Sequence, residues 1–276
     1  MREITLEELL EAGCHFGHQV TRYNPKAREF IFEARDGIHI IDLAQTKAGL
    51  EEAAAFIKSI AKKPGSSIII VGTKRQAQTL VEEEVKRARN ATAEVSKEPE
   101  IFSVTTRWLG GTLTNSGEVA KNYQKLKDLT KRLKSDEEKE KYTKKEIGQW
   151  EKDRQKLQSL YGGVVDMKKV PDALFIVDTH MEHLAVLEAR RMGVPLVGIV
   201  DTNADPAIID YPIPANDDAV GSLKLIVGYI IDAWIEGKTK GEETAAPEKK
   251  EKKVKKEEVS VTETEEKPKK VEKKKE

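Results

Sequence analysis

The chain has 276 residues, of which 38% are hydrophobic and 35% are charged, and its formal net charge is zero. This length suits one large domain or two ordinary ones. The single cysteine, Cys14, excludes an intramolecular disulfide and favours a cytoplasmic protein. The N-terminal residues lack the apolar centre of a signal peptide, and no apolar run approaches the ~20 residues of a membrane span. We therefore expect neither a secreted protein nor a membrane protein.

Charge is distributed unevenly along the chain. Residues 107–156 contain 14 basic and 9 acidic residues, whereas residues 160–238 contain 6 basic and 12 acidic residues. The basic segment predicts a surface that binds a polyanion. Residues 239–276 contain 13 lysines and 11 glutamates and almost no apolar residues. Because such a segment buries too little surface to offset its chain entropy, we expect a disordered Lys/Glu-rich tail after a folded domain of residues 1–238.

Strand-like and helix-like segments alternate along the folded part. Thr5 and Glu8 predict a capping box that opens a short helix ending at Gly13. The continuous apolar run within 66–72 is typical of a buried parallel strand. The expected strands are 37–43, 66–72, 100–106, 172–178 and 195–201, and the expected longer helices are 45–63, 74–89, 181–193 and 219–235. This alternation predicts an α/β fold, a parallel sheet with helices on both faces.

A helical insertion interrupts the alternation at about 116–160. Two narrow apolar stripes at helical spacing indicate two helices with a charged loop between them. The stripes consist of Val119, Tyr123, Leu126, Leu129 and Leu133, and of Ile147, Trp150, Arg154, Leu157 and Leu160. Thr143 and Glu146 form a capping box for the second helix. We therefore expect an antiparallel helical hairpin, bracketed by the glycine pairs 110–111 and 162–163, which predict backbone bends.

The stretch "RWLGGTLTN" (107–115) precedes the hairpin. Arg107 suits a phosphate contact, and Trp108 suits an anchor for the hairpin base on the core. The two glycines suit the bend, and Thr114 or Asn115 suits an N-cap. The alternative is a surface loop whose cation and glycines are incidental.

Two further segments suggest anion binding. "VGTKRQAQ" follows a buried strand and opens a helix, so Lys74 and Arg75 stand where helix amides bind anions, although no Walker loop is present. "TRYNPKAREFIF" interleaves basic and aromatic side chains, as nucleic-acid surfaces do. Its members are Arg22, Lys26, Arg28, Arg35, Tyr23, Phe30 and Phe32. A plain strand-to-helix turn and a solvated loop with core anchors are the alternatives.

Possible metal ligands occur in two places. Cys14, His15 and His18 have the right chemistry for zinc, but no second ligand pair follows at finger-like spacing. Polar side chains also follow two expected strands, where α/β proteins bind ligands. The candidates for a divalent ion there are Asp178, His180, Asp201 and Asp205, with His183 and Asn203 nearby. Capping and turn formation explain Asp and Asn equally well, and no nucleophile with an adjacent base is apparent.

Several motifs occur together in an order that resembles the bacterial ribosomal protein S2 family. They are "AGCHFGHQVTRYNPK", "FIFEARDGIHIIDL", "VGTKRQA", "RWLGGTLTN", "YGGVVDM", "PDALFIVDT", "GIVDTNADP" and "IPANDDA". The resemblance covers about Ile4 to Gly237. It implies a flavodoxin-like fold with a protruding helical hairpin and a structural, non-enzymatic role in the small ribosomal subunit. It also implies small-subunit rRNA near the head–body junction, neighbouring ribosomal proteins and the mRNA-binding ribosomal protein S1 as partners.

With that resemblance, we assign to the rRNA-binding surface Arg22, Tyr23, Asn24, Lys26, Arg28, Lys74, Arg75, Arg107, Trp108, Thr112 and Asn115. We expect no cofactor beyond a possible divalent ion. The competing hypothesis is an α/β enzyme or sugar-phosphate-binding domain with its site at Asp178, His180 and Asp201. Salt-sensitive co-sedimentation with ribosomal subunits would separate the two.

Overall fold

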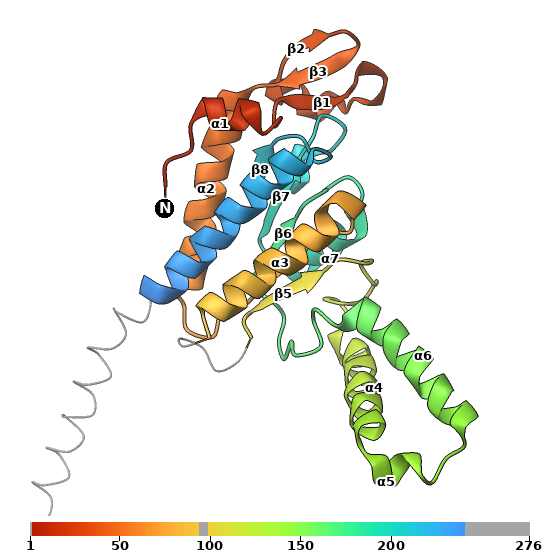
Figure 1. Cartoon of the computed structure of the whole chain (residues 1–276). Coiled ribbons are helices and arrows are strands. Elements are labelled where there is room, and N and C mark those ends of the chain that lie inside the picture. Colours follow the sequence, from red (N-terminus) through yellow and green to blue (C-terminus); the bar gives the residue numbers. More distant parts are fainter. Residues whose placement is uncertain (1, 94–98, 241–276) are drawn as a thin grey trace, which may run out of the picture.

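A five-stranded parallel sheet forms the centre of the protein. The computed structural model describes residues 2–93 and 99–240 (Figure 1). The strands lie in the order β5-β4-β6-β7-β8, and every neighbouring pair is parallel. Their bounds are β4 Ile68–Val71, β5 Ile101–Val104, β6 Ala173–Ile176, β7 Leu196–Val200 and β8 Tyr211–Pro214. Counted along the chain this is the order 2-1-3-4-5 of flavodoxin-like folds, so the predicted α/β class is confirmed.

Strand β4 shows why an unbroken apolar run forms a central strand. Side chains alternate between the two faces of a sheet. Ile68 and Ile70 therefore enter one core cluster, and Ile69 and Val71 enter the other. All four side chains are fully buried. Helices cover both faces, so no position on this strand can be polar.

Helices cover the two faces of the sheet unequally. One face packs against α2 (Leu43–Ala61), α3 (Arg75–Ala91) and a C-terminal helix over 220–240. Figure 1 shows these three helices side by side in front of the strands. The other face packs against α7 (His183–Met192) and against the loop that leads into α4. Among the described helices, none combines the length and the apolar character that crossing a membrane requires.

A second, smaller sheet lies at the N-terminal end of the chain. After α1 (Leu6–Glu11), strands β1 (Phe16–Gln19), β3 (Ile38–Ile41) and β2 (Ile31–Arg35) pair antiparallel. The connection contains the 3₁₀ turns η1 (Val20–Arg22) and η2 (Pro25–Phe30). Only β3 was expected, because residues 14–32 are rich in turn formers.

The small sheet is tied to the loop that follows β7. The His18 backbone N–H donates to Thr202 Oγ1 at 3.0 Å, and the Asn24 backbone N–H donates to the Thr202 carbonyl at 2.8 Å. An added Cβ on Gly17 would collide with the Thr202 side chain. These contacts hold the basic N-terminal loop at the carboxyl edge of the parallel sheet.

Helices α4 (Ser116–Lys134) and α6 (Lys144–Tyr161) lie between β5 and β6 and extend away from the sheet (Figure 1). A short helix, α5 (Asp136–Lys139), connects them. The rings of Tyr123 and Tyr161 meet edge to face at 5.5 Å, and Asn122 donates to the Tyr161 hydroxyl at 3.0 Å. The Thr143 capping box forms as expected.

Strand β8 was not expected, because it contains Pro212 and Pro214. It is the edge strand, where proline costs the fewest ladder bonds. The 3₁₀ turn η3 (Pro206–Ile208) precedes it. The C-terminal helix continues through 240, so the first two residues of the predicted tail are helical. Residues 241–276 lie outside the described part, and their predicted disorder stays a prediction.

Candidate nucleic-acid interface

The loop 107–115 is held by one carboxylate, that of Glu188 on α7. Glu188 Oε1 accepts hydrogen bonds from the Trp108 indole N–H at 3.2 Å and from the Gly111 N–H at 2.7 Å. Its Oε2 accepts from the backbone N–H groups of Leu113 at 3.1 Å and Thr114 at 3.3 Å. Burial alone would raise the pKa of Glu188, but these hydrogen bonds lower it below its ordinary value. The amides that could bind an external anion here are therefore already occupied.

The two glycine pairs are not the two backbone bends that the sequence predicts. Only Gly111 has a positive φ, +91°, whereas Gly110 needs no left-handed conformation. Gly162 is right-handed, with a φ of −56°. At Gly163 the reason is close approach, because an added Cβ would collide with the Ser103 carbonyl oxygen. At Gly162 too an added Cβ would collide, with the Gln158 carbonyl oxygen, so one bend and two tight contacts explain three of the four glycines, and Gly110 needs neither.

The structure buries two of the residues assigned to RNA contact. Trp108 is 3% exposed and belongs to the core cluster beneath α7. Thr112 is 4% exposed, and its hydroxyl donates to the Leu109 carbonyl at 2.6 Å. Their side chains shape the loop from within, as an anchor would, and they present no surface to a nucleic acid. The assignment of these two as direct contacts is corrected accordingly.

Apart from Lys26, whose ammonium is paired with Asp205, five of the assigned residues lie exposed on the surface. They are Arg22, Arg28, Arg75, Arg107 and Asn115. Within the described residues, the four arginines make no ion pair, so their guanidinium groups are available to phosphate. Asn115 occupies the N-cap position of α4, but its side chain makes no capping hydrogen bond. The expected side-chain cap at Asn115 is therefore wrong, and its side-chain amide makes no hydrogen bond within the described residues.

The remaining residues of the N-terminal loop have partners inside the protein. Tyr23 is half-buried, with its ring 5.3 Å from that of His39. Asn24 Oδ1 accepts from the Lys26 N–H at 3.0 Å and caps η2. Lys26 Nζ lies 2.5 Å from Asp205 Oδ2. These side chains fix the shape of the loop, while its arginines carry the free charge.

Lys74 is not a free cation at a helix N-terminus. Its Nζ lies 2.9 Å from Asp178, 2.7 Å from Asp217 and 2.8 Å from Asp218. Burial alone would lower the pKa of Lys74, but the three aspartates raise it above its ordinary value. In a flavodoxin-like sheet the point between β4 and β6 is the usual ligand site. Here the protein fills that point with its own ion pairs, so a phosphate contact by Lys74 is not supported.

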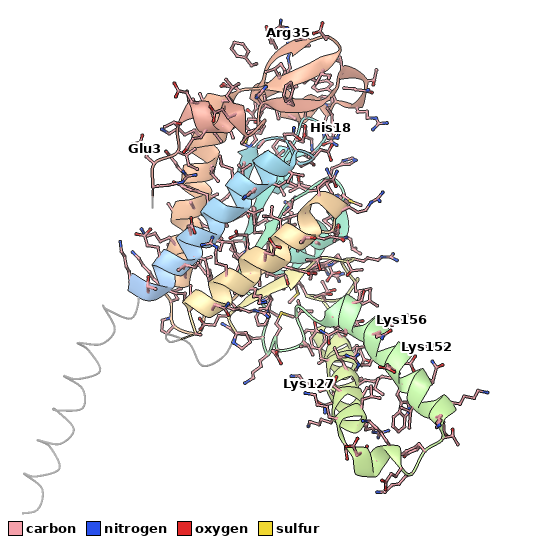
Figure 2. The ribbon with its side chains drawn as sticks, in the orientation of Figure 1. Glu3, His18, Arg35, Lys127, Lys152 and Lys156 are labelled. Atoms are coloured by element: carbon pink, nitrogen blue, oxygen red, sulfur yellow. The ribbon has the colours of Figure 1, made fainter. Side chains whose placement is uncertain are left out.

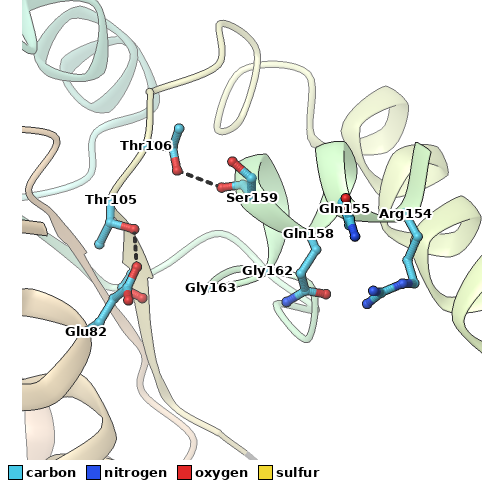
Figure 3. A pocket seen from close by; sticks show the side chains of 10 residues that line it. Glu82, Thr105, Thr106, Arg154, Gln155, Gln158, Ser159, Gly162 and Gly163 are labelled. Atoms are coloured by element: carbon cyan, nitrogen blue, oxygen red, sulfur yellow. Dashed lines mark hydrogen bonds between the residues drawn. The ribbon is translucent and has the colours of Figure 1, made fainter. Parts of the chain in front are cut away.

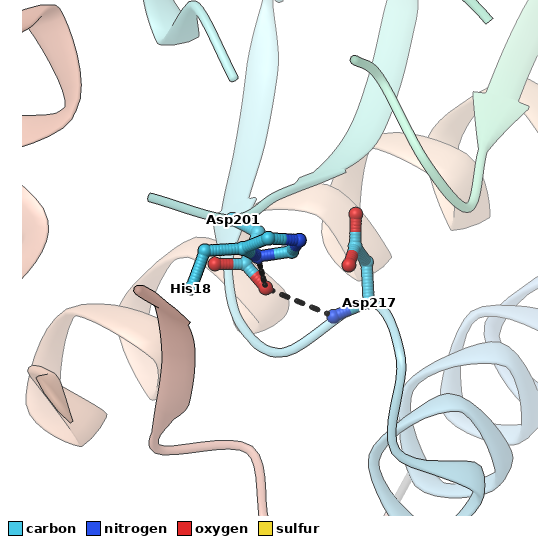
Figure 4. A group of neighbouring side chains, drawn as sticks. All are labelled: His18, Asp201 and Asp217. Carbon is cyan, nitrogen blue, oxygen red and sulfur yellow. Dashed lines mark hydrogen bonds and ion pairs between the residues drawn. The ribbon is translucent and has the colours of Figure 1, made fainter. Parts of the chain in front are cut away.

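The predicted metal candidates do not meet at one point. Asp178 pairs with Lys74, Asp205 pairs with Lys26, and His180 is exposed. Only Asp201 belongs to a group whose ligand atoms lie within 4.8 Å of one another, and its other members are His18 and Asp217 (Figure 4). The competing enzyme hypothesis placed one site at Asp178, His180 and Asp201. Those three residues do not assemble.

His18 links the small sheet to this buried group. Its Nδ1 lies 3.1 Å from Asp201 Oδ2, and the hydrogen bond to Asp201 raises the pKa of the imidazole. Asp217 is 1% exposed. Burial raises the pKa of its carboxyl to about 8, helped by the charges of Asp178 and Asp201 and opposed by Lys74. The first motif containing histidine therefore supplies an internal ion pair. Cys14 and His15 stand outside this group.

Sequence reasoning missed a row of cations on α6. Lys145, Lys152 and Lys156 are exposed, and none has an ion-pair partner in the described part of the chain. Lys152 and Lys156 stand seven and eleven residues after Lys145, which is about two and three helical turns, so the three lysines lie along one side of α6. We call them the α6 lysine row (Figure 2 labels Lys152 and Lys156). The spacing was visible in the sequence.

Comparison with known protein families identifies the family of this chain. The family model of ribosomal protein S2 matches residues 9–237. The chain belongs to the ribosomal protein S2 family. The match covers both sheets, α4 and α6, and nearly all of the C-terminal helix. S2 family membership makes the chain a structural component of the small ribosomal subunit, with a role in translation, in a family of structural proteins.

Proposed function

We propose that this S2 family chain acts in the cytoplasm by binding small-subunit rRNA near the junction of head and body. The α6 lysine row is the observation that carries the proposal. Three unneutralised ammonium groups along one side of a helix form a track for phosphates, and each phosphate contact releases counterions from the RNA. Arg107 and the exposed arginines of the N-terminal loop are further cations without ion pairs in the described residues.

We further propose that α4 and α6 act as one inserted antiparallel coiled-coil hairpin that holds the lysine row away from the sheet. The edge-to-face contact of Tyr123 with Tyr161 supports this at the base. Near the far end, Arg132 lies over the Trp150 ring at 5.6 Å, and Tyr142 meets the same ring at 4.5 Å. Aromatic contacts at both ends would keep the two helices in register.

The salt dependence of rRNA binding tests the proposal. Lys152→Ala combined with Lys156→Ala removes two cations from the row, and Lys62→Ala combined with Lys63→Ala removes two exposed cations at the end of α2. The first variant should weaken binding to small-subunit rRNA and lower the slope of log Kd against log salt by about two units. The second variant should bind like the unmodified chain.

Two results would overturn this function. Failure of the unmodified chain to co-sediment with small-subunit particles at low salt is one. Equal loss of affinity in both double variants is the other, because it would show a general charge effect without a defined track. Melting temperatures of both variants should match that of the unmodified chain, since the four lysines are exposed and lack ion pairs in the described residues.

We propose that the small sheet provides the docking surface for ribosomal protein S1. Phe32 on β2 is 72% exposed and Phe16 on β1 is 48% exposed. Contiguous exposed apolar patches mark protein–protein interaction sites. Phe32→Ala should reduce co-purification of S1 while leaving rRNA binding unchanged. Retention of S1 at the unmodified level would remove this part of the proposal.

A cofactor is not part of the proposed function. A divalent ion, if one binds, has the group of His18, Asp201 and Asp217 as its candidate position. The Lys74 ammonium already lies 2.7 Å from Asp217 and competes with a cation there. Calorimetric titration with Zn²⁺ and Mg²⁺, repeated with Asp201→Asn, would detect such a site.

A further inference from the structure

A polar cavity opens where the base of α6 meets the end of β5. It has a volume of about 550 Å³, within the range of ligand sites in proteins. The face of α6 supplies one wall, and the end of β5 with Glu82 of α3 supplies the other (Figure 3). Every lining residue is polar or glycine, and no apolar side chain lines the cavity. Such a lining favours a ligand rich in hydrogen-bonding groups.

Hydrogen bonds connect the elements that form the walls of the cavity. Thr105 donates to Glu82 at 2.7 Å, and Thr106 donates to the Ser159 carbonyl at 2.8 Å. Beneath them, Arg89 donates to the carbonyl groups of Ile101 at 2.9 Å and Gly163 at 3.2 Å. The floor at Gly163 tolerates no Cβ. These contacts fix β5 and the end of α6 at a constant separation.

The groups that remain unpaired point to the ligand. Arg154, Gln155 and Gln158 line the cavity, and their side chains have no hydrogen-bond partner in the described part of the chain. A guanidinium group matches a phosphate. A glutamine amide offers both donors and an acceptor, which match the edge of a nucleobase or a ribose hydroxyl. The Glu82 carboxylate adds an acceptor for an exocyclic amino group.

The surroundings indicate a nucleotide within a polymer. Lys152 and Lys156 of the α6 lysine row lie on the same helix as the three cavity residues. At about 100° per residue, Arg154 lies on the side of α6 opposite the row, and Gln155 lies between them. A phosphate chain that follows the row therefore reaches the cavity only by passing around α6 at Gln155. Proteins read RNA sequence mainly through bases that leave the stack and enter such pockets.

We propose that this cavity receives a single unstacked nucleotide of the small-subunit rRNA. Arg154 binds its phosphate, and Gln155 and Gln158 bind its base edge. The inference rests on the proposed rRNA binding and adds a base-reading contact to a surface otherwise made of phosphate contacts.

Paired variants test the cavity separately from the lysine row. Gln155→Ala combined with Gln158→Ala removes neutral hydrogen-bonding groups from exposed helix positions, so folding is preserved. Its control is Gln124→Ala combined with Gln149→Ala, which changes one exposed glutamine on α4 and one on α6 outside the cavity, each hydrogen-bonded to a neighbouring aspartate. Each full-length variant is bound to small-subunit rRNA, and the reactivity of every base edge is read by chemical probing.

The cavity variant should bind about tenfold more weakly, as expected for two lost hydrogen bonds, with an unchanged salt slope. One base protected by the unmodified chain should regain reactivity. Arg154→Ala should lower the salt slope by about one unit and expose the same nucleotide. The control should retain the protection.

Full protection and affinity in the cavity variant would overturn the inference. If Lys152→Ala with Lys156→Ala still weakens binding in that case, the proposed rRNA binding stands without the cavity. If the unmodified chain does not bind rRNA, both fall together.

Discussion

Glu188 Oε1 lies 3.2 Å from the Trp108 indole nitrogen and 2.7 Å from the Gly111 backbone nitrogen. One carboxylate on α7 thus holds both the buried anchor and the bend of the loop that leads into α4. The direction of α4 and α6, and with it the place of the lysine row, depends on this contact. An acidic residue in the acidic half of the chain therefore organises the basic half.

Replacement of Glu188 tests that dependence. Glu188→Ala should lower the free energy of unfolding by about 2–3 kcal/mol, because several buried donors lose a charged acceptor. Glu188→Gln should lose less, since one carbonyl oxygen still accepts. Both values come from thermal or urea unfolding at pH 7. If the loop sets the direction of α4 and α6, incorporation of the glutamine variant into subunits should fall even under conditions where the variant remains fully folded. Equal stability of all three proteins would contradict the anchoring role.

Acid titration gives the same contact a second readout. The pKa of Glu188 is lowered in the folded state, so its contribution is present above the ordinary carboxyl pKa and is lost as the pH falls through the folded value. The unmodified chain should therefore lose stability below about pH 4.5 more steeply than Glu188→Gln. Equal pH dependence of stability in the two proteins would contradict the role of the Glu188 carboxylate.

The central sheet could be predicted because its strands are apolar in sequence and are covered on both faces in the fold. The run Ile68–Val71 is apolar at every position, and a central strand covered on both faces needs that. The Thr143 capping box was equally local. By contrast, β8 contains two prolines, and its pairing with β7 depends on being an edge.

The site was less predictable than the fold because its contacts join distant parts of the chain. Lys74 reads locally as a free cation after a strand, yet its aspartate partners at 217 and 218 stand more than a hundred residues away. Glu188 gives no local sign that it binds the loop 107–115. Burial of Trp108 as an anchor could be predicted from its residue type, whereas its hydrogen bond to Glu188 on α7 could not.

Asp217 and His18 predict a loss of stability as the pH rises from mild acid through neutrality. The pKa of Asp217 is raised to about 8 by burial, and that of His18 is raised by Asp201. A folded pKa above the unfolded value gives stability that is present at low pH and lost as the pH rises through the folded pKa. The contribution of Asp217 is therefore lost between its ordinary value of 3.8 and about 8, and that of His18 is lost above 6.5. Unfolding should become easier as the pH rises from about 4 to about 8. Asp217→Asn, which mimics the protonated carboxyl, should flatten this profile, and an unflattened profile would show that other groups cause it.

The glycines at 110 and 111 provide a matched pair. Gly111→Ala should destabilise the fold by about 1–2 kcal/mol, because its φ of +91° lies where a side chain is strained. Gly110→Ala should be close to neutral, since an added Cβ would lie 3.5 Å from Leu184, an ordinary contact. Unfolding midpoints of the two single variants decide the matter. Equal midpoints would show that the bend tolerates a side chain.

Arg107 separates the phosphate contact from the architecture of its loop. Its guanidinium is exposed and makes no ion pair within the described residues, whereas its neighbour Trp108 is buried. Arg107→Ala should therefore keep the melting temperature and weaken binding to small-subunit rRNA, with the log–log salt slope lower by about one unit. Arg107→Lys keeps the charge but loses the bidentate fork, so it should restore the slope and only part of the affinity. An alanine variant with an unchanged slope would show that Arg107 touches no phosphate, whatever holds its loop in place.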